Sequence, residues 1–197
     1  MVLLFNAPAQ GLLGRQTTMP VDQSSPDLAS LIGHRLALVH YWWVSRRGGE
    51  RILEVLADMF RQADIFTLVL DPKALPPSLR SRKITMSFLQ KIPGMIRHYK
   101  KFLLLFPLAL EQFKLDEYDL VTSSESGPAK GVLTRPHTYH ICYCHIPMRY
   151  VWDMYHQCRA EKGMGIVSRS VFCVAAHYMR IWDLAAGVRG RLSRAPI

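Results

Sequence analysis

The length, composition and charge of this chain limit the classes of protein that it can represent. Its 197 residues suit one domain of ordinary size, and 49% hydrophobic residues favour a packed core over extensive disorder. No apolar run reaches the ~20 residues of a membrane-spanning helix, and the first ten residues lack the basic start of a secretory signal. We therefore expect a cytoplasmic protein whose four cysteines are reduced.

The predicted elements alternate between strands and helices. Residues 1–34 mix Gly, Pro, Gln and Ser without a period, and we expect a disordered leader there. Apolar runs bounded by turn residues predict strands at 36–40, 65–70, 84–88, 119–122 and 139–143. Apolar residues at helical spacing predict helices at about 50–60, at 95–113 with a kink near Pro107, and at 166–184, with Val167, Val171, Val174, Tyr178 and Trp182 on one face.

This alternation predicts an α/β fold. We expect a Rossmann-like parallel sheet with helices on both faces over residues 35–186, and an irregular tail over residues 187–197. Ligands bind beyond the carboxyl ends of the strands in such sheets. The unusual residues gather at those ends, after three of the predicted strands: Gly48 and Gly49, Ser123 and Ser124, and His145.

A glycine pair opens the first predicted helix. Gly48 and Gly49 precede Glu50, which lies in the first turn, where the helix dipole favours an acid. Glycines let backbone amides approach an anionic ligand closely, although a plain tight turn is an equally simple interpretation. The segment is neither a dinucleotide-binding fingerprint nor a P-loop.

His145 is the candidate for chemistry. It follows the strand 139–143, and Pro147 suits the first turn of a following helix, which places the imidazole at the edge of the sheet. The alternative is a structural histidine. Cys142 and Cys144 lack the paired spacing of structural zinc sites, so we expect no metal. The absence of a G-x-S-x-G segment argues against serine hydrolase chemistry.

Three segments together resemble the amino-terminal domain of bacterial family 4 glycosyltransferases. They are Leu38–Trp42 with Arg47–Arg51, Tyr118–Val121 leading into Ser123–Val132, and Cys142–Asp153, and the last is the most specific. Their order and spacing also match, and the resemblance covers about residues 35–184. It implies one half of a GT-B architecture, in which two Rossmann-like domains face each other across a cleft.

The resemblance also implies a function. Family members transfer a sugar, here a hexosyl group for a glycan or cell-surface polysaccharide, from a nucleotide-sugar donor to a glycan or lipid-linked acceptor, with retention of configuration and without a metal or other cofactor. By resemblance, His145 is the catalytic residue that contacts the transferred sugar. The expected substrate-binding residues are Gly48, Gly49, Glu50, Ser123, Ser124, Lys130 and Arg149.

The family carries its donor-binding groups in a second domain, for which residues 187–197 give no sign. We therefore expect an acceptor-side half that folds but does not catalyse transfer alone.

The net charge of +10 keeps a non-enzymatic alternative open, in which this basic half-domain binds a partner protein, a membrane surface or nucleic acid. Lys91, Arg97, Lys100 and Lys101 lie beside the apolar run 102–106, a mixture that suits peripheral contact with an anionic membrane. A helix packed on the sheet with a solvated basic edge explains the same pattern. No nucleic-acid recognition motif is present, so we expect no nucleic-acid partner for the enzyme.

Overall fold

The computed structural model describes residues 2–5, 33–46, 48–125, 128–145, 148–149, 151–160 and 165–192. Six residues of the predicted motifs therefore lie outside the described residues: Arg47, Ser126, Gly127, Ile146, Pro147 and Tyr150. None of the described helices combines the length and the hydropathy that are needed to cross a membrane.

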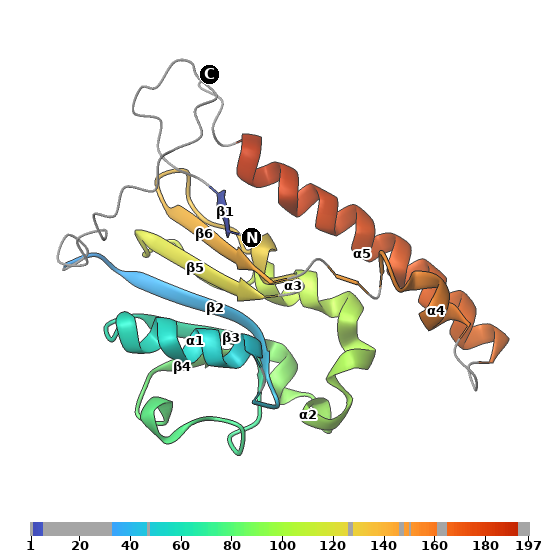
Figure 1. Ribbon diagram of the computed structural model, residues 1–197, viewed down its shortest axis with the longest axis horizontal. Coiled ribbons are helices and arrows are strands. Elements are labelled where there is room, and N and C mark those ends of the chain that lie inside the picture. Colours follow the sequence, from blue (N-terminus) through green and yellow to red (C-terminus); the bar gives the residue numbers. More distant parts are fainter. Residues whose placement is uncertain are drawn as a thin grey trace.

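A sheet in the order β1-β6-β5-β2-β3-β4 organises the described part of the chain (Figure 1). Neighbouring strands from β6 to β4 are parallel, and β1 is antiparallel to β6. The strands are β1 (Val2–Phe5), β2 (Leu36–Trp43), β3 (Asp64–Leu70), β4 (Ile84–Met86), β5 (Leu120–Glu125) and β6 (Tyr139–Cys144). The parallel strands confirm the predicted Rossmann-like α/β class.

Helices cover both faces of this sheet, as predicted. On one face, Leu53 of α1 (Gly48–Met59) shares a hydrophobic cluster with Leu38 of β2. On the other face, Phe106 of α3 (Phe106–Glu111) and Met179 of α5 (Ile166–Leu192) share a cluster with Val39. The remaining helical elements are η2 (Pro77–Leu79), η3 (Phe88–Lys91), α2 (Met95–His98), η4 (Tyr99–Leu105), η5 (Pro128–Gly131) and α4 (Tyr155–Arg159).

The central strand β2 shows why an apolar run predicted a strand. Hydrogen bonds join it to β3 on one side and to β5 on the other, and residues 36–40 are nearly inaccessible to solvent. A strand that is covered on both faces has to be apolar on both, so its sequence shows no alternation. His40 is the polar exception within this buried run.

The segment 95–113 is not the single kinked helix that was predicted. It consists of α2, the 3₁₀ segment η4 and α3 in succession, and the backbone leaves helical geometry at Phe102. Pro107 does not kink a helix but lies in the first turn of α3. A proline is favoured there because the first helical N–H groups have no partner within the helix.

The structure also extends several elements beyond their predicted ends. Ser123 and Ser124 do not form a turn after the strand but belong to β5, where both are buried. Val2–Phe5, within the expected leader, pair with β6, and α5 runs to Leu192, into the expected tail. The strand at Val2–Phe5 forms because β6 would otherwise be an edge strand, whose free backbone groups can pair with a further strand.

The expected apolar face of α5 divides into two faces. Trp182 is buried in the core with Ala176, Met179 and Ala186. In contrast, the stripe that begins at Val167 faces away from the described core and is exposed. On α1, too, two of the apolar residues whose spacing predicts the helix are exposed, Val55 and Met59.

Candidate functional site

Two histidines and a serine meet at the carboxyl edge of the parallel sheet. His40 lies in β2, Ser124 lies opposite it in the neighbouring β5, and His145 follows β6 directly. Nδ1 of His40 is 2.6 Å from the carbonyl oxygen of Ser124, and Nε2 of His145 is 3.1 Å from Oγ of the same serine. Ser124 therefore joins the two imidazoles through its backbone and its side chain.

The hydrogen bond of His40 determines its tautomer. A carbonyl oxygen only accepts, so Nδ1 of His40 carries the proton and donates it to Ser124, which leaves Nε2 as an acceptor. Nε2 is buried and has no hydrogen-bond partner among the described residues. The pKa of His40 is lowered to about 4, chiefly by burial and also by the nearby His145, while the hydrogen bond to Ser124 acts in the opposite direction. His40 is therefore neutral at pH 7.

His145 is more accessible than His40 and also neutral. Partial burial lowers its pKa below the ordinary value for histidine. The ring of Tyr143 packs edge-on against the imidazole, with centroids 5.0 Å apart. Ser124 itself is fully buried, so its hydroxyl group orients His145 and is not exposed to act as a nucleophile.

The start of α1 lies against both imidazoles. A Cβ atom on Gly49 would lie 3.6 Å from Cε1 of His40 and 3.7 Å from Nε2 of His145, which is ordinary contact, and one on Gly48 would meet nothing within 4 Å. Neither glycine has a positive φ. The backbone conformation therefore does not require glycine at either position, and both a ligand contact and a plain turn at these glycines stay predictions.

Glu50 completes the first turn of α1, but it is only 3% exposed. A carboxylate there interacts favourably with the helix dipole. Its burial argues for a supporting role behind the glycines rather than for direct substrate contact.

The other serine of the pair, Ser123, points to the opposite face of the sheet. Its Oγ atom is 2.9 Å from Nε2 of His140, and both side chains are buried. Burial lowers the pKa of His140 to about 4, so this pair is neutral. Successive residues of a strand face opposite sides, which is why Ser123 and Ser124 do not share a site.

The structure does not bring Lys130 and Arg149 into this cluster. Lys130 forms an ion pair with Asp183 of α5 at 2.5 Å, with side chains only 11% and 9% exposed, so it is committed to an internal contact. Trp152 donates a hydrogen bond to the other carboxylate oxygen of Asp183. Arg149 is exposed and follows the buried Met148, while the next residue, Tyr150, lies outside the described part of the chain.

Sequence reasoning missed His40 and His140. Both are single polar residues within otherwise apolar strands, and this signal is visible in the sequence. Which of them belongs to the candidate site depends on the face of the sheet that each one occupies.

The site is thus a neutral imidazole, held by a buried serine, beside the open start of a helix. No family model, curated protein or solved structure matches this chain. The resemblance to family 4 glycosyltransferases therefore rests on the three sequence motifs alone and stays a prediction.

The described residues offer no metal-binding cluster, since nowhere do three His, Cys, Asp or Glu side chains gather in a way that could hold an ion. Cys142 is buried in β6. The side chains of Cys144 and Cys158 lie outside the described part of the chain.

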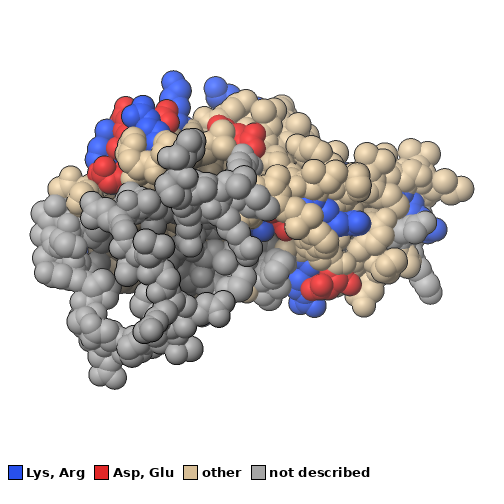
Figure 2. Space-filling model, turned by 90° about the horizontal axis from the view of Figure 1, so that it is seen from above, with Lys and Arg blue, Asp and Glu red and all other residues tan. Residues whose placement is uncertain are grey.

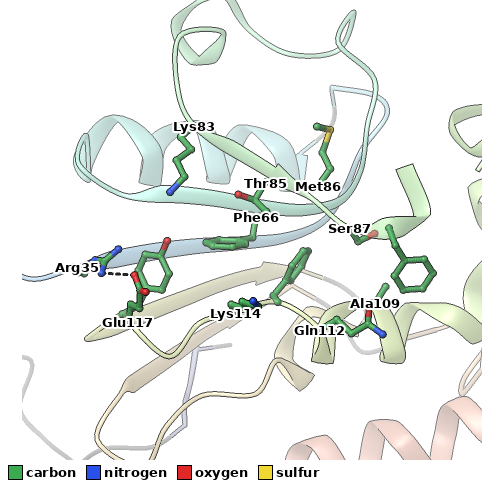
Figure 3. Close-up of a pocket in the computed structure, with 13 residues that line it drawn as sticks. Arg35, Phe66, Lys83, Thr85, Met86, Ser87, Ala109, Gln112, Lys114 and Glu117 are labelled. Carbon is green, nitrogen blue, oxygen red and sulfur yellow. Dashed lines mark ion pairs between the residues drawn. The ribbon is translucent and has the colours of Figure 1, made fainter. Parts of the chain in front are cut away.

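A cavity of about 420 Å³ lies away from this site, between the β3–β4 side of the sheet and the segment that precedes β5 (Figure 3). Phe66, Phe113 and Tyr118 are among its lining side chains, and the ring of Phe66 contacts each of the other two edge-on. Lys83 and Lys114 add positive charge. Its lining begins at residues that precede strands, such as Arg35 and Lys83, and continues along β4 to Ser87 and Phe88 beyond its carboxyl end.

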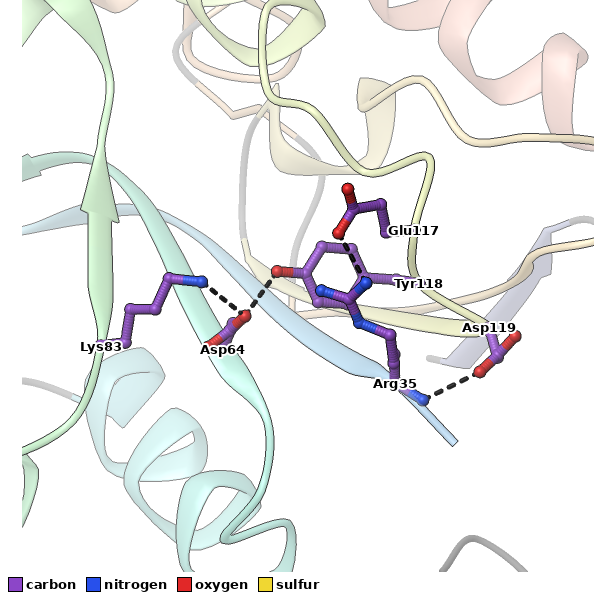
Figure 4. A network of polar contacts seen from close by, with 6 residues as sticks. All are labelled: Arg35, Asp64, Lys83, Glu117, Tyr118 and Asp119. Atoms are coloured by element: carbon purple, nitrogen blue, oxygen red, sulfur yellow. Dashed lines mark hydrogen bonds and ion pairs between the residues drawn. The ribbon is translucent and has the colours of Figure 1, made fainter. Parts of the chain in front are cut away.

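A polar network beside the cavity explains much of its charged lining (Figure 4). Asp64 accepts hydrogen bonds from Tyr118 at 2.6 Å and from Lys83 at 3.0 Å, while Arg35 forms an ion pair with Glu117. Burial works against the charged form of Asp64, but these hydrogen bonds hold the pKa of its carboxyl group below the usual value. The network joins β3, β4 and the segment before β5, so we interpret it as structural.

Proposed function

We propose that this chain is the acceptor-side half of a retaining glycosyltransferase that transfers a hexosyl group from a nucleotide sugar during glycan or cell-surface polysaccharide biosynthesis. The observation that carries the proposal is that the glycine start of α1 lies beside a neutral imidazole at the carboxyl edge of the sheet. Open α/β sheets bind their ligands at this edge.

The start of α1 suits the diphosphate of the donor. The first N–H groups of a helix have no partner within it, and they point outward at the positive end of the helix dipole. Gly48 and Gly49 have no side chains to keep a phosphate away from these groups. Negative charge grows on the diphosphate as the sugar leaves, so amides placed there stabilise the transition state more than the ground state.

His145 suits the sugar. Nε2 is engaged by Ser124, which fixes the ring and leaves Nδ1 for a sugar hydroxyl group. A neutral imidazole accepts a hydrogen bond at one nitrogen and donates one at the other, so it can position a hydroxyl group without adding charge. The lowered pKa keeps it in this form at neutral pH.

In this proposal a second domain, facing the same edge, holds the nucleotide. The described site supplies one wall of a cleft that is complete only when the two domains close on the substrates. We therefore expect weak donor binding and no measurable transfer by the chain alone.

NMR spectroscopy of the isotope-labelled chain tests the proposal. Titration with UDP-glucose or GDP-mannose is expected to shift the amide signals of Gly48 and Gly49 and the imidazole signals of His145, with millimolar dissociation constants. Inorganic diphosphate is expected to shift the glycine amides alone. His145→Ala should weaken nucleotide-sugar binding but not diphosphate binding, while His98→Ala, at an exposed position on α2, is the matched control.

Two outcomes would contradict parts of this proposal. If no nucleotide sugar shifts these signals, the edge site is not a donor site. If the purified chain transfers a radiolabelled sugar above background, the chain is a complete enzyme and not half of one.

One observation favours peripheral membrane contact as a second candidate function. Leu104, Leu105 and Leu108 are between 37% and 47% exposed, and they lie close in sequence to the exposed Lys100 and Lys101. Exposed apolar side chains that are flanked by basic ones suit an anionic lipid surface. An enzyme with a lipid-linked acceptor would benefit from such a contact.

A further inference from the structure

The long helix α5 carries an apolar stripe that the described core leaves uncovered. Scattered exposed apolar residues are normal on a protein, but a contiguous set of them marks an interaction surface. The exposed fractions are Ile166 84%, Val167 77%, Val171 58%, Val174 69%, Tyr178 43%, Ile181 56% and Leu184 59%. We call these seven residues the α5 stripe.

The spacing of the α5 stripe indicates which structure covers it. From Val167 onward, apolar residues recur at alternating steps of four and three, at Val171, Val174, Tyr178 and Ile181. In the sequence the same steps continue to Ala185, Val188 and Leu192. A repeat of about 3.5 residues is the seam of one helix that packs along another helix. A partner strand or a loop would not require this period.

The residues beside the seam favour a second copy of the same helix. Between Val167 and Ile181 the flanking positions include Ser168, Ser170, Ala175 and His177, with no Lys, Arg, Asp or Glu among them, whereas Arg189 and Arg191 flank the continuation of the seam beyond Ala185. The chain as a whole has a net charge of +10, so two copies would repel each other over most surfaces. Along this seam that repulsion is small, and the small flanking side chains allow close approach.

The described surface on the side of α4 and α5 is seen from above (Figure 2). In this view, it is mostly tan toward the right, with a few separate blue and red groups. A denser group of blue and red side chains lies at the upper left.

The size of the α5 stripe is sufficient for a dimer. Its exposed fractions correspond to roughly 800 Å² of surface on one copy, about as much as one partner contributes to a standard protein interface. Burying about two thirds of this area on each of two copies gives roughly 1,000 Å², which is the lower limit for a biological interface.

We propose that two copies of this chain pair through α5, with the α5 stripes facing each other across a two-fold axis. A two-fold interface is self-complementary, so one apolar seam serves both partners. The inference does not depend on the proposed sugar transfer, because it rests on the opposite side of α5 from the core and uses no residue of the carboxyl-edge site.

Sedimentation velocity of the purified full chain over a range of concentrations tests the pairing. The wild-type chain is expected to form a dimer at micromolar concentrations. Val171→Glu introduces a charge into the seam and should weaken the dimer by at least about tenfold, because an unpaired carboxylate is costly to desolvate. Val55→Glu is the matched control, since Val55 on α1 has the same exposed fraction of 58%. It should leave the dimer unchanged.

The outcomes separate the possible occupants of the seam. The proposal is overturned if the wild-type chain stays monomeric at every concentration. It is also overturned if the α5 stripe binds lipid vesicles and not a second copy of the chain. A dimer that Val171→Glu leaves intact overturns it as well. Circular dichroism of both variants checks that neither substitution unfolds the chain, and Val174→Glu repeats the test at the next seam position.

Discussion

Three histidines of this protein are kept neutral by the fold, although they serve different parts of it. His40 and His140 are fully buried on opposite faces of the sheet, and His145 is partly buried at its edge. Each has a serine as a hydrogen-bond partner, through a backbone carbonyl group for His40 and through side chains for the other two. A buried polar group needs such a partner, because desolvation without one is costly.

The buried histidines predict a loss of stability in acid. The pKa of His140 is about 4 in the folded state against 6.5 for an unperturbed histidine, so the unfolded state binds more protons between these values. The contribution to stability is present above pH 6.5 and is lost as the pH falls toward 4. Near pH 5 the loss is about 2 kcal/mol for each such histidine.

His140→Gln tests this linkage. The glutamine does not titrate, so the difference in the free energy of unfolding between pH 7.5 and pH 5 should be smaller than in the wild type by about 2 kcal/mol. Urea unfolding at both pH values measures it. His98→Gln, at an exposed position, should keep the wild-type pH dependence. An unchanged pH dependence in His140→Gln would show that burial does not lower the pKa of this residue.

At the scale of elements, a close contact with η5 fixes the position of α5. A Cβ atom on Gly131 would lie 2.2 Å from two ring carbons of Trp182, so only glycine fits there. The indole nitrogen of Trp182 donates a hydrogen bond to Glu111 of α3, and Lys130 pairs with Asp183 of α5. These contacts attach one face of α5 to the core and leave the α5 stripe on another face.

Gly131→Ala is expected to destabilise the fold by about 1–3 kcal/mol, because the added methyl group forces the Trp182 ring and with it α5 to shift. Gly187→Ala, within α5 and with nothing within 4 Å of the added atom, is the matched control. It should stabilise the helix by roughly 0.5–1 kcal/mol. Thermal unfolding followed by tryptophan fluorescence measures both. Equal stability of the two variants would contradict the contact between Gly131 and Trp182.

At the scale of the whole molecule, the net charge of +10 predicts attraction to anionic surfaces. In the structure, the segment that suits such a contact is η4 with α3, where exposed leucines lie close in sequence to basic residues. A segment that only contacts water needs basic residues alone, whereas a segment that binds lipid also exposes apolar side chains.

Sedimentation with vesicles tests whether η4 and α3 bind an anionic membrane. The chain should bind vesicles that contain anionic lipid and not neutral ones. The double substitution Lys100→Glu and Lys101→Glu should weaken binding at least about tenfold, because each basic residue near the surface contributes roughly 1 kcal/mol. Lys73→Glu with Arg80→Glu changes the net charge equally at exposed positions outside this segment, and it should have a smaller effect. Equal losses in both variants would attribute the binding to net charge alone.

The sequence by itself determined the class of fold and the edge at which the candidate site lies. The apolar run 36–40 predicts a strand because burial on both faces leaves no room for alternation, and Gly48 and His145 follow strands in the sequence as they do in the structure. These features are local in the chain, so the pattern of residues is sufficient to predict them.

Only the tertiary structure decided which side chains meet. Ser124 joins the site while the adjacent Ser123 faces the core, because a shift of one residue along a strand reverses the side that a residue faces. Lys130 forms its ion pair with Asp183, more than 50 positions away in the sequence. His40 of β2 belongs to the site because it forms a hydrogen bond with Ser124 of the neighbouring β5. The sequence of α5 likewise does not show which of its sides is exposed, because the helix has two apolar faces. In the structure, the face that contains Trp182 packs on the core, and the other face is exposed.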